Sequence, residues 1–329
     1  MKNLICAILS AAMLMTGCSF KKVDTKQTVA TVNGTDISAE FYLFYLTQVK
    51  KQMNSGGVED FWDTAELEGK KLIETAREKA LDEVINAVII EQKAKEQGIT
   101  ITKDEENSIN SQVTSMSAQL GSRDKYNEWL KEQGLTDEIY RRFIKINYLS
   151  QKLMNADDIQ VTDADIKEYY EKNIARVKHI LVLTTDSNNS PLSDEEVAKK
   201  REEAEGLLKR AKDGEDFDKL VEEYSEDPGS KSQPDGYYLG KGFILGSQGS
   251  MVSEFEEASL ALKVGEVSDI VETTYGFHII KRYENDPAVM EQNKDQLTSY
   301  AKNEVFTKLV ESWKKDANVD VKNDIIEKL

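Results

Sequence analysis

The chain of 329 residues contains only two histidines, two cysteines and four prolines. Two cysteines cannot build a framework of disulfides, and Cys6 lies in an apolar leader, so Cys18 is the single thiol expected in the mature chain. Basic residues are also few, because 43 Lys and Arg stand against 60 Asp and Glu, for a formal net charge of −17. Nucleic acid and anionic lipid surfaces attract Lys/Arg patches, so neither is an expected partner of this acidic surface.

The sequence also lacks an apolar run long enough to span a bilayer, which takes roughly 20 residues. Its longest such run, Leu4 to Met15, follows Lys2 and suits the apolar part of a signal peptide. The run ends in Thr16-Gly17-Cys18, which resembles the lipidation site of bacterial lipoproteins. We therefore predict a signal peptide over 1–17, lipidation of Cys18 and a tether over 18–27 that holds the protein outside the membrane. The alternative is an ordinary signal peptide with an incidental cysteine.

Helical periodicity dominates the first half of the chain. Apolar residues recur at helical spacing from Leu72 to Ile89, and Thr102 with Glu105 forms a capping-box pattern. These signals predict a helical domain over 28–173. The segment 285–329 is again amphipathic, and we predict that it packs back on this domain, which is therefore discontinuous. The aromatic run Phe41 to Tyr45 is either a contact surface for unfolded chains or, as we prefer, core.

Between these helical parts, residues 174–284 follow the order β-α-α-β-α-β-β. This order predicts an inserted domain with a four-stranded sheet and makes the fold class α+β. The two histidines lie in its first and last strands, about a hundred residues apart. If these strands are neighbours in the sheet, His179 and His278 face each other, which is an unusual arrangement for a simple core.

Several motifs in this domain resemble the parvulin peptidyl-prolyl isomerases. They are Val177 to Val182, Phe255 to Ser259, Gly265 to Ser268 and Tyr275 to Ile280. Together with the leader and the flanking helices, the whole chain resembles the PrsA-type extracellular foldase lipoproteins of Gram-positive bacteria. The resemblance implies isomerisation of X-Pro bonds and chaperone activity toward unfolded or partly folded secreted polypeptides. The oligomeric state stays open, a homodimer included.

The resemblance also implies roles for individual residues. His179 and His278 form the floor of the site and orient each other through hydrogen bonds, and Asp227 is the third polar position. Met251 and Phe255, one helical turn apart, line the proline pocket, and Thr273 lies beside it. From the residues alone, Asp227 is equally well explained by an Asp-Pro-Gly turn, and Met251 and Phe255 by core packing.

Rotation about an X-Pro bond breaks no covalent bond, so the reaction needs neither a cofactor nor a metal. Two departures from the family weigh against catalysis. Gln233-Pro234-Asp235-Gly236 stands where the family has Gly-Asp-Leu-Gly, so either Asp235 takes the place of an apolar wall residue or the register of the loop shifts. The loop 241–250 is also longer than the family's loop. A non-catalytic holdase lipoprotein on the same fold is therefore the alternative function.

Two further expectations concern ligands. A solute-binding or zinc-binding lipoprotein is a third class, but two His and one Asp without clustered spacing make a poor zinc site. The loop Thr185 to Ser190 has no basic residue, so we predict that the enzyme does not require a phosphate before the proline.

Overall fold

The computed structural model describes residues 24–53, 62, 64–67, 69–156, 159–186, 190–230 and 232–329. The predicted signal peptide, Cys18 and the first part of the tether lie outside these residues. Residues 187–189 of the loop Thr185 to Ser190, from which we predict that no phosphate is required, lie outside them as well. Within the described ranges, every helix is too short or too polar to cross a bilayer.

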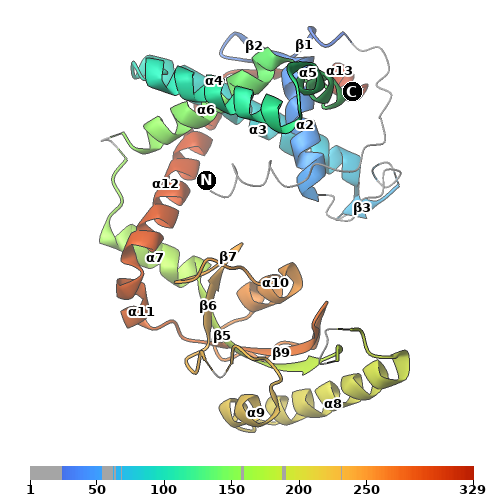
Figure 1. The fold of residues 1–329 in the computed structure, drawn as a ribbon. Helices are drawn as coiled ribbons and strands as arrows, with labels where there is room; N and C mark the ends of the chain where they lie inside the picture. The colour runs from blue at the N-terminus through green and yellow to red at the C-terminus, as the bar shows by residue number, and fades with distance from the viewer. Residues whose placement is uncertain are drawn as a thin grey trace. The chain divides into compact units, whose positions relative to one another are not determined.

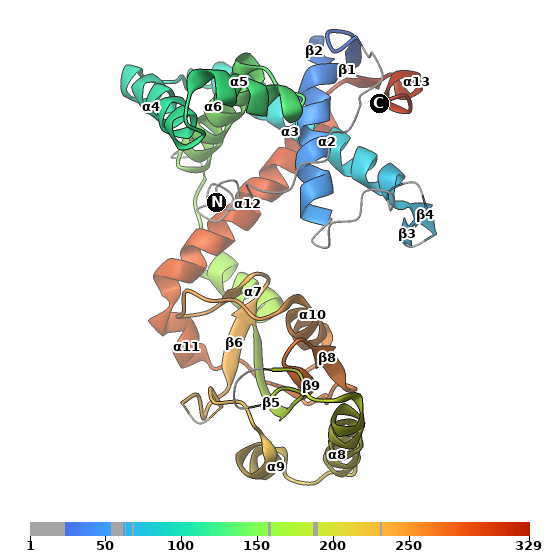
Figure 2. The ribbon, with the colours of Figure 1, turned by 45° about the vertical axis from the view of Figure 1, so that its right-hand side comes forward.

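The chain divides into two compact units (Figures 1 and 2). The first consists of the described parts of Met1–Asp158 together with Phe306–Leu329. Its elements are β1 (Thr28–Val32), β2 (Thr35–Ser38), α2 (Ala39–Met53), β3 (Glu66–Leu67), β4 (Lys70–Lys71), α3 (Leu72–Glu96), α4 (Lys103–Gln119), α5 (Arg123–Glu132), α6 (Asp137–Met154), the end of α12 (Lys294–Asp316), β10 (Val319–Val321) and α13 (Asn323–Ile326). The capping box of Thr102 and Glu105 begins α4 as predicted.

The two ends of the described chain meet in this unit. β10 pairs antiparallel with β1, with Ala30 opposite Val321, in a sheet of order β10-β1-β2. Ile326 of α13 joins the core that α2 and α3 build. All five residues from Phe41 to Tyr45 are buried in this core. The helical domain is therefore discontinuous, as predicted, and the aromatic run is core rather than a contact surface.

The second unit is Ile159–Val305. Its elements are α7 (Asp163–Asn173), β5 (Ala175–Leu183), α8 (Asp194–Lys212), α9 (Phe217–Tyr224), β6 (Tyr237–Gly240), β7 (Phe243–Ile244), α10 (Ser253–Ala261), β8 (Val271–Thr273), β9 (Gly276–Tyr283), α11 (Pro287–Gln292) and the first part of α12. The sheet has five strands in the order β7-β6-β5-β9-β8, not the predicted four. The prediction lacks β7, which is only two residues long. The third predicted strand, over Val267 to Val271, begins only at Val271, because Val267 forms a single isolated bridge, to Lys281.

The period-two alternation of β5 and β9 divides the sheet into two faces. Ile180, Val182, Phe277 and Ile279 lie in one apolar cluster with residues of α8 and α9. Val177 and Ile280 lie in another cluster, with Phe255 of α10. Figure 1 shows α8 and α9 below the sheet and α10 above it. The residues of the two strands that share a face with Val177 and Ile280 include both histidines.

The second unit is larger than the predicted domain 174–284. Ile166 and Tyr170 of α7, and Leu297 and Ala301 of α12, share an apolar cluster with Phe243 and its neighbours on the sheet. The predicted parts 28–173 and 285–329 are therefore too long, because α7 and the first part of α12 pack with the sheet. Amphipathic periodicity shows that a helix has an apolar face, but it does not identify the surface that covers this face.

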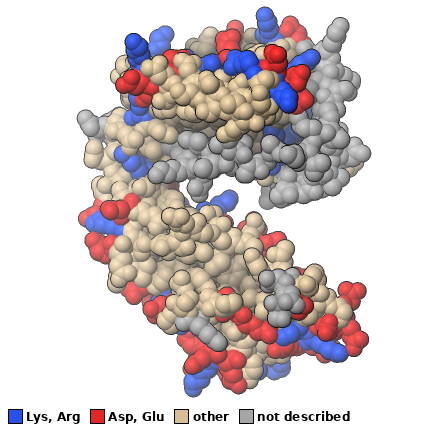
Figure 3. All heavy atoms as spheres, in the orientation of Figure 1, with Lys and Arg blue, Asp and Glu red and all other residues tan. Residues whose placement is uncertain are grey.

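The surface of α8 and α9 carries both signs of charge. On the face in Figure 3, basic side chains over these helices are interspersed with acidic ones. Arg201 pairs with Glu272 of β8 at 2.5 Å, and Arg210 pairs with Glu215 at 2.6 Å. These ion pairs fasten α8 to the edge of the sheet and to the start of α9, although exposed pairs contribute little to stability.

Candidate active site

The two histidines lie on adjacent antiparallel strands. His179 of β5 is opposite Ile280, and His278 of β9 is opposite Leu181, so the two side chains are diagonal neighbours on one face. Their ring centroids are 5.3 Å apart and their planes are inclined by 41°. The structure thus brings together the two residues that the sequence places at opposite ends of the domain.

Both imidazoles are buried, with only 4% of His179 and 5% of His278 exposed. Burial lowers the pKa of His179 to about 4, although the nearby Asp227 carboxylate opposes this shift. Burial and the neighbouring His179 lower the pKa of His278 to about 3. Both rings are therefore neutral near pH 7, and each offers one hydrogen-bond donor and one acceptor.

Asp227 contacts His179 from the loop that follows α9. Its Oδ2 lies 3.6 Å from Nε2 of His179 and accepts hydrogen bonds from the hydroxyls of Tyr237, at 2.8 Å, and Ser230, at 2.9 Å. Its Oδ1 accepts the backbone N–H of Gly229 at 3.1 Å, which closes the Asp-Pro-Gly turn. Burial favours the neutral acid, but His179 and the three donors outweigh it, so the pKa of Asp227 falls below its ordinary value. Asp227 thus both closes the Asp-Pro-Gly turn and contacts the imidazole of His179.

Thr273 holds the other imidazole. Its Oγ1 lies 2.9 Å from Nε2 of His278 and also accepts the backbone N–H of Tyr275 at 3.1 Å. The hydroxyl has two acceptor lone pairs and one hydrogen, so it can accept from Tyr275 and either donate to Nε2 or accept from it, according to the tautomer of His278. In the described part of the chain, neither Nδ1 of the pair has a hydrogen-bond partner. The expected hydrogen bonds between the two rings are therefore not seen, and the outer partners orient the rings instead.

Phe255 completes the group from α10. Its ring is nearly perpendicular to both imidazoles, with centroid distances of 4.9 Å to His179 and 5.2 Å to His278. Met251 is half-buried and packs against the same apolar cluster. It precedes the helix, because α10 begins at Ser253 with Val252 as its cap. The predicted shared turn of helix is therefore wrong, although the two residues do belong to one cluster.

Asp235 does not occupy the apolar wall of this site. Its side chain is 86% exposed and lies 3.7 Å from the guanidinium of Arg176. Tyr237 and Leu239 of β6 lie on the site's face instead, and the ring of Tyr237 is 5.8 Å from that of His179. The expectation that Asp235 replaces the wall is wrong, because the Asp235 side chain is exposed beside Arg176 and does not line the site. Tyr237 was missed as a site residue, although its period-two spacing from Leu239 could have indicated it.

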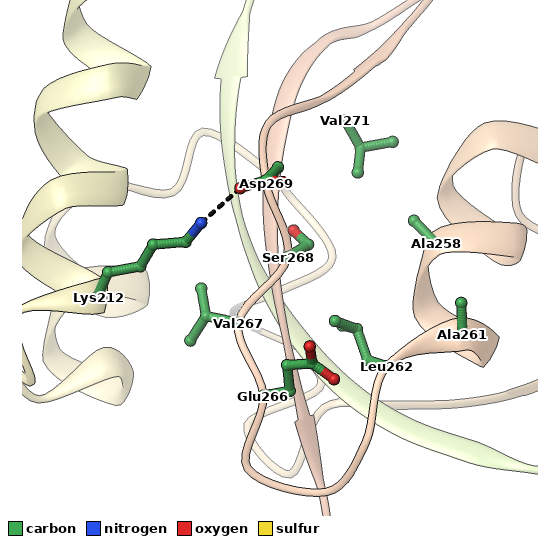
Figure 4. A pocket seen from close by; sticks show the side chains of 9 residues that line it. All are labelled: Lys212, Ala258, Ala261, Leu262, Glu266, Val267, Ser268, Asp269 and Val271. Atoms are coloured by element: carbon green, nitrogen blue, oxygen red, sulfur yellow. Dashed lines mark hydrogen bonds and ion pairs between the residues drawn. The ribbon is translucent and has the colours of Figure 1, made fainter.

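A pocket of about 410 Å³ lies nearby but is distinct from this group (Figure 4). It is lined by Lys212, Ala258, Ala261, Leu262, Glu266, Val267, Ser268, Asp269 and Val271. None of the six predicted site residues lines it, although Val271 pairs with His278 across the strands. Figure 4 shows Lys212 reaching from α8 to Asp269 at its rim.

Metal-binding side chains do not gather at the histidines. Across the described ranges, no three His, Cys, Asp or Glu side chains are grouped so that they could hold a metal ion. The Nε2 atoms of the two rings face different partners, Asp227 and Thr273. The geometry is that of two neighbouring rings with separate partners: His278 lies in hydrogen-bond contact with Thr273, and His179 lies 3.6 Å from Asp227.

Comparison with known proteins identifies the family. Residues 164–286 match the PPIC-type PPIASE domain, and residues 1–154 match the SurA-like N-terminal domain. Foldase protein PrsA of Caldanaerobacter subterraneus subsp. tengcongensis is 31% identical over 324 residues, which cover 93% of this chain and 90% of that protein. The chain belongs to the PrsA foldase family. Foldase protein PrsA of Clostridium botulinum strain 657 is 32% identical over 314 residues, with coverages of 89% and 88%.

A solved structure of peptidylprolyl isomerase (PrsA) from Bacillus anthracis is 28% identical, covers 72% of this chain and 96% of its own, and has a TM-score of 0.31. A score this low supports no structural argument, so the family assignment rests on the sequence matches. As a member of the PrsA foldase family, the chain is a parvulin-type peptidyl-prolyl cis-trans isomerase and chaperone. The function and the α+β fold predicted from the sequence are confirmed.

Proposed function

We propose that this chain isomerises X-Pro bonds of secreted polypeptides at His179, His278 and Asp227, outside a membrane to which lipidated Cys18 anchors it. Met251, Phe255 and Thr273 bind the prolyl residue in this proposal. The observation that carries it is the contact of the Phe255 ring with both imidazoles, which joins an apolar surface to two oriented polar rings.

The chemistry suits these groups. An X-Pro bond rotates over a barrier of roughly 20 kcal/mol, and the uncatalysed step takes on the order of 10–100 s. At the top of the barrier the amide is twisted and has lost its conjugation, so groups that favour the twisted form accelerate the reaction. Phe255 and Met251 offer the pyrrolidine ring an apolar seat. Neutral imidazoles can hydrogen-bond to the twisted amide without placing a net charge beside that seat.

The roles of the supporting groups follow from their contacts. The Asp227 carboxylate and the Thr273 hydroxyl hold the outer nitrogens, so the two rings need not reorganise during the reaction. Because Asp235 lies outside the wall of the site, the main sequence argument for a non-catalytic holdase loses its support. No nucleophile, metal or cofactor takes part in the proposed step.

Isomerisation of a short proline peptide by the full chain tests the catalytic part. We expect His278→Ala and His179→Ala each to reduce kcat/KM about a hundredfold, the lower end of the effect of removing one preorganised donor from an active site. Suppression of client aggregation should persist in both variants, because the helical unit is unchanged. Equal turnover by wild type and both variants would refute the proposed site, and aggregation suppression without turnover by wild type would favour the holdase.

The anchor needs a separate test. Cys18→Ala expressed in a Gram-positive host should leave the membrane fraction, and it should not incorporate labelled palmitate. Retention of the variant in the membrane fraction would exclude Cys18 as the anchor. Sedimentation of the chain without its leader distinguishes a monomer from a homodimer.

A further inference from the structure

Glu256 is the one acidic side chain that is buried in the described part of this acidic chain, with 8% of its surface exposed. It directly follows Phe255 on α10. Carboxylates are almost never buried without a partner, because removing their hydration costs several kcal/mol. A buried carboxylate beside the residue that touches both imidazoles therefore needs a structural explanation.

The partner of Glu256 is a backbone amide. Its Oε2 accepts the N–H of Gly242 at 2.6 Å. Gly242 forms the turn between β6 and β7 and has a φ of 79°, a left-handed conformation that favours glycine. A hydrogen bond to an ionised acceptor is about twice as strong as one between neutral groups. Glu256 thus ties this turn to α10.

The chain beyond Gly242 leads to Met251 and has its own supports. Leu245 N–H donates to the carbonyl of Tyr238 at 2.7 Å, and Ile244 N–H to that of Gly249 at 2.9 Å. On its other side the loop is held by α12. The ring of Phe243 stacks on that of Tyr300 at 4.1 Å, and Gly246 N–H donates to the side chain of Gln296 at 3.1 Å.

We propose that Glu256 is a positioning residue of the isomerase. By holding the β6–β7 turn against α10, it sets the loop that delivers Met251 beside Phe255, and so shapes the seat of the prolyl ring. This inference rests on the proposed roles of Met251 and Phe255. The histidines lie on β5 and β9 and do not depend on this turn. Glu256 therefore affects binding of the prolyl residue more than the isomerisation step.

The kinetic test compares Glu256→Ala with Glu256→Gln in the full chain, using a short proline peptide. The alanine variant removes the tie between the turn and α10 but keeps the other supports of the loop, and we expect KM to rise about threefold to tenfold, with kcat changed by less than about twofold, because binding must then order this part of the loop. The glutamine variant keeps an oxygen that can accept from Gly242, and its KM should stay near the wild-type value. Glu257→Ala, at the exposed neighbouring position of the same helix, is the matched control and should change neither constant.

A second measurement is independent of turnover. Hydrogen exchange at the Gly242 amide should accelerate in Glu256→Ala and stay slow in Glu256→Gln and Glu257→Ala. If exchange responds in this way while the wild type shows no turnover, the tie is real and the proposed function fails. Unchanged exchange or unchanged KM in Glu256→Ala overturns the inference, as does an equal rise of KM in Glu257→Ala. If the alanine variant does not fold, Glu256→Asp, which is one methylene shorter, should show the same acceleration of exchange and rise of KM.

Discussion

His179 and His278 face each other at 5.3 Å, yet each is held through its Nε2 by a different residue. Asp227 is the partner of the first ring, and Thr273 is the partner of the second. The Nδ1 atoms are buried and have no partner in the described part of the chain. The orientation of the pair is therefore controlled from its two outer sides, and each side can be altered separately.

Removing the Thr273 hydroxyl should disturb only the ring of His278. Thr273→Val keeps the shape of the side chain but loses the 2.9 Å contact with Nε2. We expect kcat/KM for a proline peptide to fall by roughly tenfold, since the imidazole must then be ordered during catalysis. Thr273→Ser retains the hydroxyl and should keep most of the activity. Full activity of the valine variant would show that Thr273 does not orient the ring.

The pH dependence should reflect neutral histidines. With pKa values of about 4 and about 3, neither ring is protonated between pH 5 and 8, so activity should be flat there and fall only below about pH 4. An unfolded histidine binds its proton near pH 6.5, so the unfolded state holds more protons between pH 6.5 and 4. The free energy of unfolding should therefore be highest above pH 6.5 and decrease as the pH falls toward 4.

Rate measurements and urea unfolding at several pH values test both statements. An activity profile with a midpoint near pH 6.5 would contradict the burial of the rings. His278→Phe removes one of the two groups and should reduce the pH dependence of the free energy of unfolding.

Tyr237 should contribute to stability through Asp227. Tyr237→Phe removes one of three donors to a carboxylate whose side chain is only 16% exposed. Hydrogen bonds to charged groups are worth roughly 1.5–3 kcal/mol, so we expect a loss of free energy of unfolding in that range. Tyr275→Phe alters a residue that is 56% exposed and is the matched control. Equal unfolding curves for wild type and Tyr237→Phe would rule out this contribution.

The helices that flank the sheet should determine how stable the isolated isomerase unit is. A fragment of residues 174–284 leaves Phe243, Tyr238 and Leu245 without the side chains of α7 and α12 that cover them. Exposing a buried apolar side chain costs about 1.5–3 kcal/mol, so this fragment should melt well below a fragment of residues 159–305. Tyr300→Ala in the longer fragment should melt between the two. Equal melting of both fragments would show that the flanking helices do not stabilise the sheet.

Sequence patterns predicted those features of this structure that depend on local periodicity or on motif. His179 and His278 could be paired from the sequence because each lies in a strand whose surroundings match a known pattern. Asp235 was misplaced because its position depends on the path of a loop, and Arg176 attracts its carboxylate outside the sheet. Tyr237 was missed because its hydroxyl meets Asp227 only after two loops have folded. α7 was assigned to the wrong unit because the cover of its apolar face comes from Phe243 and Leu297, both far along the chain.

The pairing of β1 with β10 also determines when the helical unit can be completed. Thr31 lies opposite Asp320, so the central strand of the first sheet gains its second neighbour only near the end of the chain. During synthesis the residues of β1 emerge before those of β10, so β1 must wait for this partner. The sheet that carries the histidines lies between them in the chain and has its complete set of strands earlier. All strands of the isomerase sheet are therefore synthesised before β10, the last strand that the sheet of β1 needs.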